Sequence, residues 1–130
     1  MKKETTGTYI DGFVLALPKK DAEAYSRWAR KTGSIWREHG ALEVKECVAD
    51  QLTGPDATGK TGSPFQSTMK LKSGETMFFS YVVFKSRAHR DRVSAKVYAD
   101  PRSIKLMDPK NMPFSAKRMA FGGFKVVVDL

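Results

Sequence analysis

This sequence has one cysteine, two histidines and no long hydrophobic run, and each shortage excludes a class of protein. The lone Cys47 rules out an internal disulfide and is typical of a reducing compartment. One cysteine and the separated His39 and His89 are too few for the four ligands of a zinc site, so we expect no metal. No apolar stretch reaches membrane-span length and the first residues show no signal-peptide pattern, so we expect a cytoplasmic protein with no membrane partner.

The chain carries a large excess of positive charge. Lys and Arg total 23 against 14 acidic residues, which gives a formal net charge of +9. An excess of this size raises RNA or another polyanion as a partner. The basic residues are scattered rather than gathered in a run, which favours a solvated surface. A basic RNA-binding module therefore stays as the alternative function.

Hydrophobic periodicity predicts one domain over residues 1–130. We expect residues 1–7 to be disordered, 51–74 to be a long loop and 102–114 to be irregular. The predicted order is strand, helix, strand, strand, helix, strand, which is that of a ferredoxin-like α+β fold with one antiparallel sheet and two helices on one face. The strands are expected at about 8–17, 42–50, 75–84 and 117–128, and the helices at 21–40 and 86–99.

The third predicted strand, ETMFFSYVVF, is apolar on both faces. Strand alternation places Phe79 and Tyr81 on one face and Phe78 and Phe84 on the other. Two helices cover one face only, so something else must cover the second. We expect a homodimer that packs sheet against sheet, with a bound ligand or nucleic acid as the alternative cover. Alternation alone does not say which face meets the partner.

Residues 54–61, GPDATGKT, match the phosphate-binding loop G-x-x-x-x-G-K-T of nucleotide hydrolases. Gly54, Gly59, Lys60 and Thr61 would then bind nucleotide. Such a loop requires a helix to begin at once, but Gly-Ser-Pro at 62–64 would break its first turn. The parallel sheet of a hydrolase is also not predicted. We interpret the match as chance and expect no nucleotide.

Several short blocks together resemble the YbaA-like family, a small bacterial family of unassigned function. This family belongs to the dimeric α+β barrel superfamily and is related to the antibiotic-biosynthesis monooxygenases. The resemblance covers about residues 9–126 and implies a dimeric α+β barrel but no particular reaction. The family usually has MPFDGKRM in its last block, so Ser115 here replaces an acidic residue. The blocks are YIDGF (9–13), HGALEVKEC (39–47), ETMFFSYVVF (75–84), DPR (100–102) and MPFSAKRMAFGGF (112–124).

Asp11 is a carboxylate inside an apolar strand and needs a partner there. Arg118, at the start of the last strand, is the candidate partner. His39 ends the first helix, where it would meet either terminal carbonyls or a pocket. Cys47 alternates with apolar residues and is expected to be a buried thiol. The residues predicted to line a ligand pocket are Tyr9, Asp11, Trp36, His39, Tyr81 and Arg118.

These observations predict a protein that binds a small molecule in a cavity between sheet and helices. Cofactor-independent chemistry, as in the related monooxygenases, is an open option. No nucleophile, base and orienting group stand out as a set, so we assign no catalytic residue and expect no cofactor.

Overall fold

The computed structural model describes residues 8–52 and 64–130. The residues of the phosphate-loop match, Gly54, Gly59, Lys60 and Thr61, lie outside the described residues, as do residues 1–7. The elements are β1 (Tyr9–Pro18), α1 (Ala22–Glu38), β2 (Glu43–Val48), α2 (Phe65–Thr68), β3 (Glu75–Phe84), α3 (Arg87–Ala99), α4 (Pro101–Leu106) and β4 (Met119–Lys125), with single 3₁₀ turns at Lys19–Asp21, Pro109–Asn111 and Ala116–Arg118.

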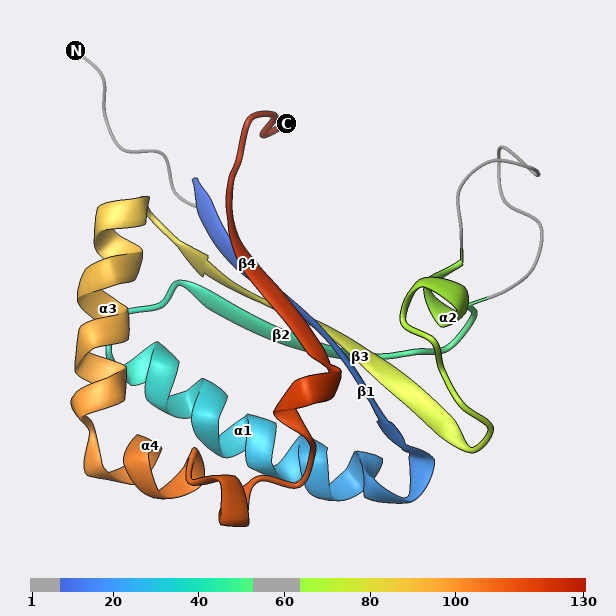
Figure 1. Cartoon of the computed structure of the whole chain (residues 1–130). Helices are drawn as coiled ribbons and strands as arrows, with labels where there is room; N and C mark the ends of the chain where they lie inside the picture. The colour runs from blue at the N-terminus through green and yellow to red at the C-terminus, as the bar shows by residue number, and fades with distance from the viewer. Residues whose placement is uncertain (1–7, 53–63) are drawn as a thin grey trace.

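The four strands form one antiparallel sheet in the order β2-β3-β1-β4. Helices α1, α3 and α4 all lie on one side of this sheet, and the opposite side, called here the open face, carries no long helix (Figure 1). The arrangement confirms the ferredoxin-like α+β fold. The antiparallel pairing also differs from the parallel sheet that a phosphate-binding loop would need. Among the described residues, no helix has the length and apolar character to cross a bilayer.

The core forms where α1 and α3 pack on the sheet. Helix α1 buries one stripe at three- and four-residue steps, including Tyr25, Ala29, Ile35 and Trp36. Ser86 caps the start of helix α3, and its hydroxyl accepts from the His89 N–H. The strand residues that meet the helices are buried, and Leu15, Phe78, Val82 and Phe84 each have at most 5% of their surface exposed.

The segment after α3 is more regular than predicted. Asp100-Pro101 does end α3, but the same pair starts α4. The Asp100 carboxylate accepts from the Arg102 N–H, and Pro101 occupies the first helical turn. This is a standard helix start, so the expectation of an irregular segment was wrong at its beginning. The expected loop at 51–74 likewise contains the short helix α2, which follows Pro64.

Gly123 marks a close approach between β4 and β1. The pairing of β1 with β4 runs without a bulge through Gly12–Gly122 and Asp11–Gly123. A Cβ atom at Gly123 would lie 2.3 Å from the hydroxyl oxygen of Tyr9. The glycine therefore leaves the space that the Tyr9 ring occupies.

Replacing this glycine should destabilise the fold. Gly123→Ala should lower the free energy of unfolding by about 1–3 kcal/mol, because Tyr9 must move away from its place. Gly122→Ala is the matched control, since its Cβ would meet Phe124 at an ordinary 3.5 Å. Urea denaturation of both variants measures the difference. Equal stability of the two would contradict this account of the β1–β4 contact.

Candidate ligand cavity

A cavity of about 250 Å³ lies between α1 and the sheet. Its apolar wall comes from both layers and from the chain after α4. Both tryptophans of the protein and three methionines line it. The apolar wall consists of Phe13, Tyr25, Trp28, Trp36, Val44, Val82, Tyr98, Met107, Met112, Phe114 and Met119.

Packed aromatic rings hold this wall in place. The Tyr25 ring lies 4.5 Å from the ring of Phe78, and the rings of Trp28 and Phe114 lie 5.0 Å apart edge to face. The indole N–H of Trp28 donates to the carbonyl of Leu106 over 2.8 Å. This bond ties the end of α4 to α1, so the cavity is bounded by interlocked side chains.

The polar side of the cavity is formed by Tyr25, Glu46 and Ser80. The Tyr25 hydroxyl donates to Glu46 Oε1 over 2.9 Å, and Ser80 hydrogen-bonds within the same group. Burial raises the pKa of the Glu46 carboxyl, although both hydroxyls oppose the rise. The pKa of Tyr25 is also raised, first by burial and then by the neighbouring carboxylate. Tyr25 is therefore a neutral hydrogen-bond donor over the physiological pH range.

Glu46 also faces a groove on the surface. As a residue it is exposed, because β2 is an edge strand, while its carboxyl end reaches the buried Tyr25. The groove has a volume of about 640 Å³ and runs between α1 and β2. Gly33, Val44 and Glu46 line both the groove and the cavity. The carboxylate thus stands at the junction of the two spaces.

A charged pocket adjoins the cavity on the β4 side. Its volume is about 310 Å³, and Phe13, Trp36 and Tyr98 line it as well as the cavity. Arg90 of α3 donates to Asp11 of β1 over 2.7 Å. Burial raises the pKa of the Asp11 carboxyl, and the charge of Arg90 partly offsets the rise.

The structure corrects the predicted partner of Asp11. That partner is Arg90, and Arg118 instead pairs with Glu75 at 2.7 Å. Antiparallel pairing explains the error, because the start of β4 lies beside the far end of β1, where Leu15 faces Met119. Arg118 is therefore remote from Asp11. Tyr9 stays close to the charged pocket, with its ring 4.9 Å from the guanidinium of Arg90.

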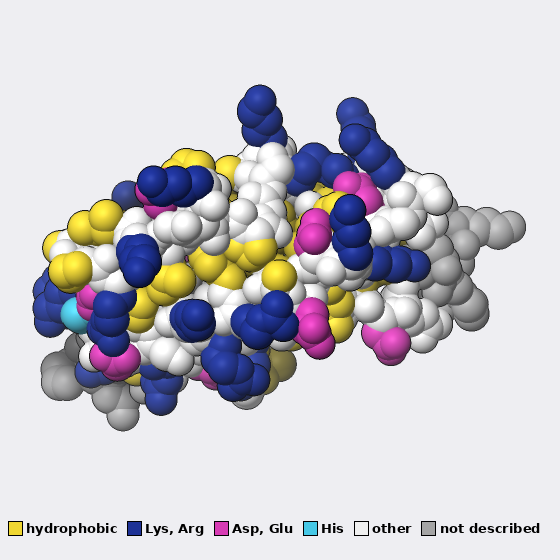
Figure 2. All heavy atoms as spheres, turned by 90° about the horizontal axis from the view of Figure 1, so that it is seen from below, with side chains coloured by type: hydrophobic (Ala, Val, Ile, Leu, Met, Phe, Trp, Pro, Cys, Tyr) yellow, Lys and Arg dark blue, Asp and Glu magenta, His cyan; other side chains and the backbone are white. Residues whose placement is uncertain are grey.

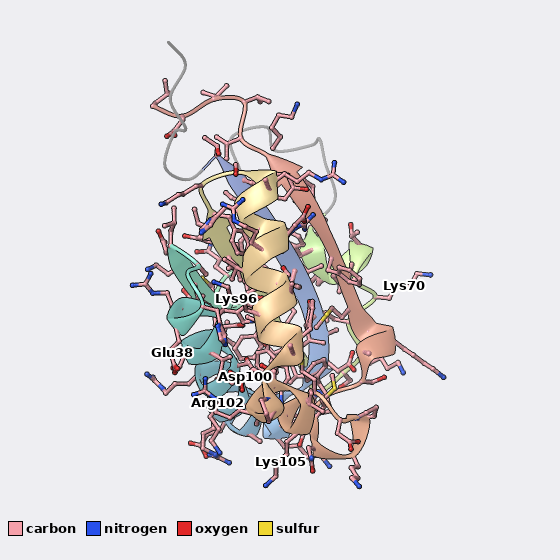
Figure 3. All side chains as sticks on the ribbon, turned by 90° about the vertical axis from the view of Figure 1, so that its left-hand side faces the viewer. Glu38, Lys70, Lys96, Asp100, Arg102 and Lys105 are labelled. Carbon is pink, nitrogen blue, oxygen red and sulfur yellow. The ribbon has the colours of Figure 1, made fainter. Side chains whose placement is uncertain are left out.

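His39 lies away from the cavity, in a polar cluster where α1, α3 and α4 converge. Its Nε2 hydrogen-bonds the Asp100 carboxylate at 2.9 Å. Arg102 bridges Asp100 and Glu38, at 2.8 Å and 3.0 Å (Figure 3). Hydrogen bonds from Arg102 and then His39 hold the pKa of Asp100 well below its usual range. His39 therefore has a structural contact here rather than a place in the cavity.

Tyr81 lies on the open face, on the other side of the sheet from the cavity. Its hydroxyl donates to Glu43 Oε2 over 3.2 Å. This face has an apolar hollow of about 830 Å³. The hollow is lined by residues of β1, β3 and β4 together with Val126 and Val128. Of the six predicted residues, the structure therefore gathers Tyr9, Asp11 and Trp36 around the cavity and the charged pocket, and it places His39, Tyr81 and Arg118 elsewhere.

Cys47 is exposed, contrary to the expected buried thiol. It alternates correctly with Val48 and faces the open side of β2, beside Phe79 of β3. Because β2 is an edge strand and α1, α3 and α4 all lie on the other side of the sheet (Figure 1), alternation with apolar residues does not bury the thiol.

Residues 8–116 match the family described as protein of unknown function (DUF1428). The chain belongs to this family. Curated relatives include the uncharacterized protein YbaA of Escherichia coli strain K12 and that of Shigella flexneri. Each is 36% identical over 121 residues, which covers 93% of this chain and 97% of the relative. The YbaA-like resemblance is thus confirmed, and the link to antibiotic-biosynthesis monooxygenases stays a prediction.

Two solved structures share the fold with this DUF1428 protein. An uncharacterized NIPSNAP domain protein from Burkholderia xenovorans superposes with a TM-score of 0.54 at 12% identity, over 92% of this chain and 94% of that one. A dimeric ferredoxin-like protein from an uncultured marine organism gives a TM-score of 0.53 at 13% identity, over 94% and 98%. These likenesses support the ferredoxin-like fold.

The Ser115 side chain has a local structural role in this DUF1428 member. The Ser115 hydroxyl accepts from the Lys117 N–H over 3.3 Å and caps the turn Ala116–Arg118. Aspartate caps helix starts equally well. Ser115 therefore caps this turn without a charge.

Sequence reasoning missed Tyr25, Glu46, Ser80 and Arg90. A signal was present for Glu46 and Ser80, because each is a polar residue between two apolar ones on the helix-facing side of its strand. Tyr25 was read as a core residue only. Among the described residues, no group of three or more acidic, histidine or cysteine side chains is placed to hold a metal ion.

Glu46→Gln should stabilise the protein at pH 8 and have little effect near pH 4. In the unfolded chain the carboxyl ionises near its ordinary pKa of 4.5, whereas the raised pKa in the folded state opposes ionisation there. Ionisation therefore favours the unfolded chain as pH rises above 4.5, and the loss is complete above the folded pKa. Glutamine does not ionise, so the variant does not lose this stability, and its side-chain oxygen still accepts the hydrogen bond from Tyr25. The melting temperature of Glu46→Gln should therefore be a few degrees above that of the parent at pH 8.

Melting curves across this pH range test the prediction. Glu43→Gln is the matched control on the same strand, because Glu43 faces the open side and pairs with Tyr81 and Lys45. The Glu43→Gln variant should show no increase in melting temperature that grows with pH. A Glu46→Gln variant that is less stable than the parent at pH 8 would contradict the assignment.

Proposed function

We propose that this protein is a homodimer that binds a small molecule in the cavity of each subunit. The observation that carries the binding role is an interior space of about 250 Å³ whose wall is aromatic and whose side holds the Tyr25–Glu46 hydrogen bond. Ligand sites are typically concave and apolar with a few placed polar groups. This cavity has that composition.

The open face supports the homodimer. Phe79 is 46% exposed and Phe124 is 61% exposed, and both lie in the apolar hollow of this face. Soluble monomers rarely expose a large continuous apolar patch. Two such faces packed together would bury on the order of 1,500 Å², the size of a stable interface. The marine ferredoxin-like protein of the same fold is described as dimeric.

Charge favours a second copy over RNA on this face. Lys45 is the single Lys or Arg among the described strand residues that point to the open side, and it lies 3.4 Å from Glu43. A sheet that binds single-stranded RNA needs cations along the backbone path. On the helix side, Lys and Arg side chains are spread with acidic side chains between them (Figure 2). The described strands therefore place little positive charge beside Phe79 and Phe124 on the open face.

If the cavity also catalyses a reaction, its side chains support proton transfer without a cofactor. A carboxyl group with a raised pKa is the type of group used as a general acid or base. Glu46 is such a group, and Tyr25 fixes its position.

The two faces of β3 should respond differently to charge. Phe79→Asp should yield a folded monomer, because the charge would enter the sheet-to-sheet interface. Phe78→Asp should unfold the chain, because Phe78 is 3% exposed and packs beneath Tyr25. Sedimentation velocity measures the mass and circular dichroism the fold. A parent protein that sediments as a monomer at micromolar concentration would end the dimer proposal.

Filling the cavity should abolish ligand binding. Naphthalene is a suitable first probe, and quenching of Trp28 and Trp36 fluorescence reports its entry because both line the cavity. Val82→Phe should reduce naphthalene affinity at least tenfold, since residue 82 projects into this space. Val83→Phe is the control on the opposite face and should leave affinity unchanged. Undetectable quenching in the parent would contradict small-molecule binding at this site.

A further inference from the structure

Two glutamate–tyrosine pairs lie on opposite faces of β2. Glu43 pairs with Tyr81 on the open face and has Lys45 at 3.4 Å. Glu46 pairs with Tyr25 on the cavity side, and among the described residues no Lys, Arg or His lies within ion-pair distance of it. The cavity carboxylate is therefore the one of the two that lacks a described cation.

The Glu46 carboxylate has unused acceptor capacity. A carboxylate accepts about four hydrogen bonds, and Tyr25 donates one of them, with the Ser80 hydroxyl beside both groups. A partly buried carboxylate without a cation is unfavourable for folding unless further donors reach it. The remaining lone pairs lie where the groove meets the cavity, so a molecule in the cavity can supply the missing donor.

The groove between α1 and β2 gives access to this carboxylate. Gly33 of α1 lies over Val44, and a Cβ atom there would come within 3.2 Å of Val44 Cγ1. The glycine therefore lets α1 pack closely on β2 at this point. Arg30 and Arg37 stand along the groove, and Arg37 donates to the carbonyls of Ala41 and Leu42. Glu38 and Glu46 line the same groove, so its side chains carry charges of both signs.

The cavity wall selects the chemical class of the ligand. Aromatic and methionine side chains favour a flat, polarisable, apolar body. A cavity of 150 Å³ holds benzene, so 250 Å³ suits about ten heavy atoms. An anion would meet the charge of Glu46, and a cation would lose its hydration in a wall with few acceptors. A neutral molecule with one hydrogen-bond donor satisfies both limits.

We propose that the cavity takes a neutral bicyclic aromatic molecule whose hydroxyl or N–H donates a hydrogen bond to Glu46. Glu46 is the ligand-binding residue, and Tyr25 and Ser80 are positioning residues that hold its carboxylate. This inference rests on the proposed small-molecule function and assigns the class of ligand and its polar anchor.

A pair of probes that differ by one donor tests the inference. The dissociation constants of 2-naphthol and naphthalene are measured by calorimetry, with the protein titrated into each dissolved compound at pH 8. We expect 2-naphthol to bind about tenfold more tightly or better, as for a hydrogen bond to a charged group. Glu46→Gln should bring 2-naphthol close to naphthalene, since an amide turns a donor toward the ligand. Glu43→Gln should leave both constants unchanged.

Each other outcome overturns a definite statement. If neither compound binds the parent, the proposed function fails and this inference with it. If both bind equally and Glu46→Gln changes neither, the cavity binds ligands but Glu46 is not the anchor. Tighter binding of 2-naphthylmethylammonium than of 2-naphthol would replace the neutral ligand by a cation. Unchanged naphthalene affinity in Glu46→Gln shows that the variant is folded.

Discussion

A sheet that is apolar on both faces, with α1, α3 and α4 on one face only (Figure 1), is the constraint from which the other features follow. Helices α1 and α3 bury Phe78, Val82 and Phe84. On the other side Phe79, Tyr81 and Phe124 remain in an apolar hollow. The two faces of the sheet therefore differ in their proposed roles. The covered side leaves room between packed rings for a ligand, and the open side has the character of a subunit interface.

The order of elements and the facing of strand residues could be predicted from the sequence because both depend on local periodicity. Alternation in ETMFFSYVVF assigned Phe78 and Phe79 to opposite faces, and the structure agrees. Tyr25, Ala29 and Trp36 have the three-and-four spacing of a buried helix stripe in the sequence, and the structure buries them. Each prediction needed only the geometry of one element. The side of the sheet that carries the helices was not available from alternation.

The errors arose where a contact joins distant parts of the chain. Asp11 meets Arg90 through packing of α3 on the sheet, which no local pattern indicates. Sequence reasoning found only part of the candidate site, because the rest also depends on contacts between distant parts of the chain. Asp11 and Trp36 were noticed as unusual residues within their own elements, but Tyr25 and Glu46 gain their meaning from each other, across a helix-to-strand contact. Cys47 was misjudged because its strand lies at the edge of the sheet.

The place of Cys47 links the chemistry of a thiol to assembly. It is the single cysteine of the chain, and it stands beside Phe79 on the face proposed to meet a second subunit. A bulky adduct on the sulfur and the partner's sheet would occupy the same space. In the proposed dimer, modification of this thiol and association of the subunits would therefore exclude each other.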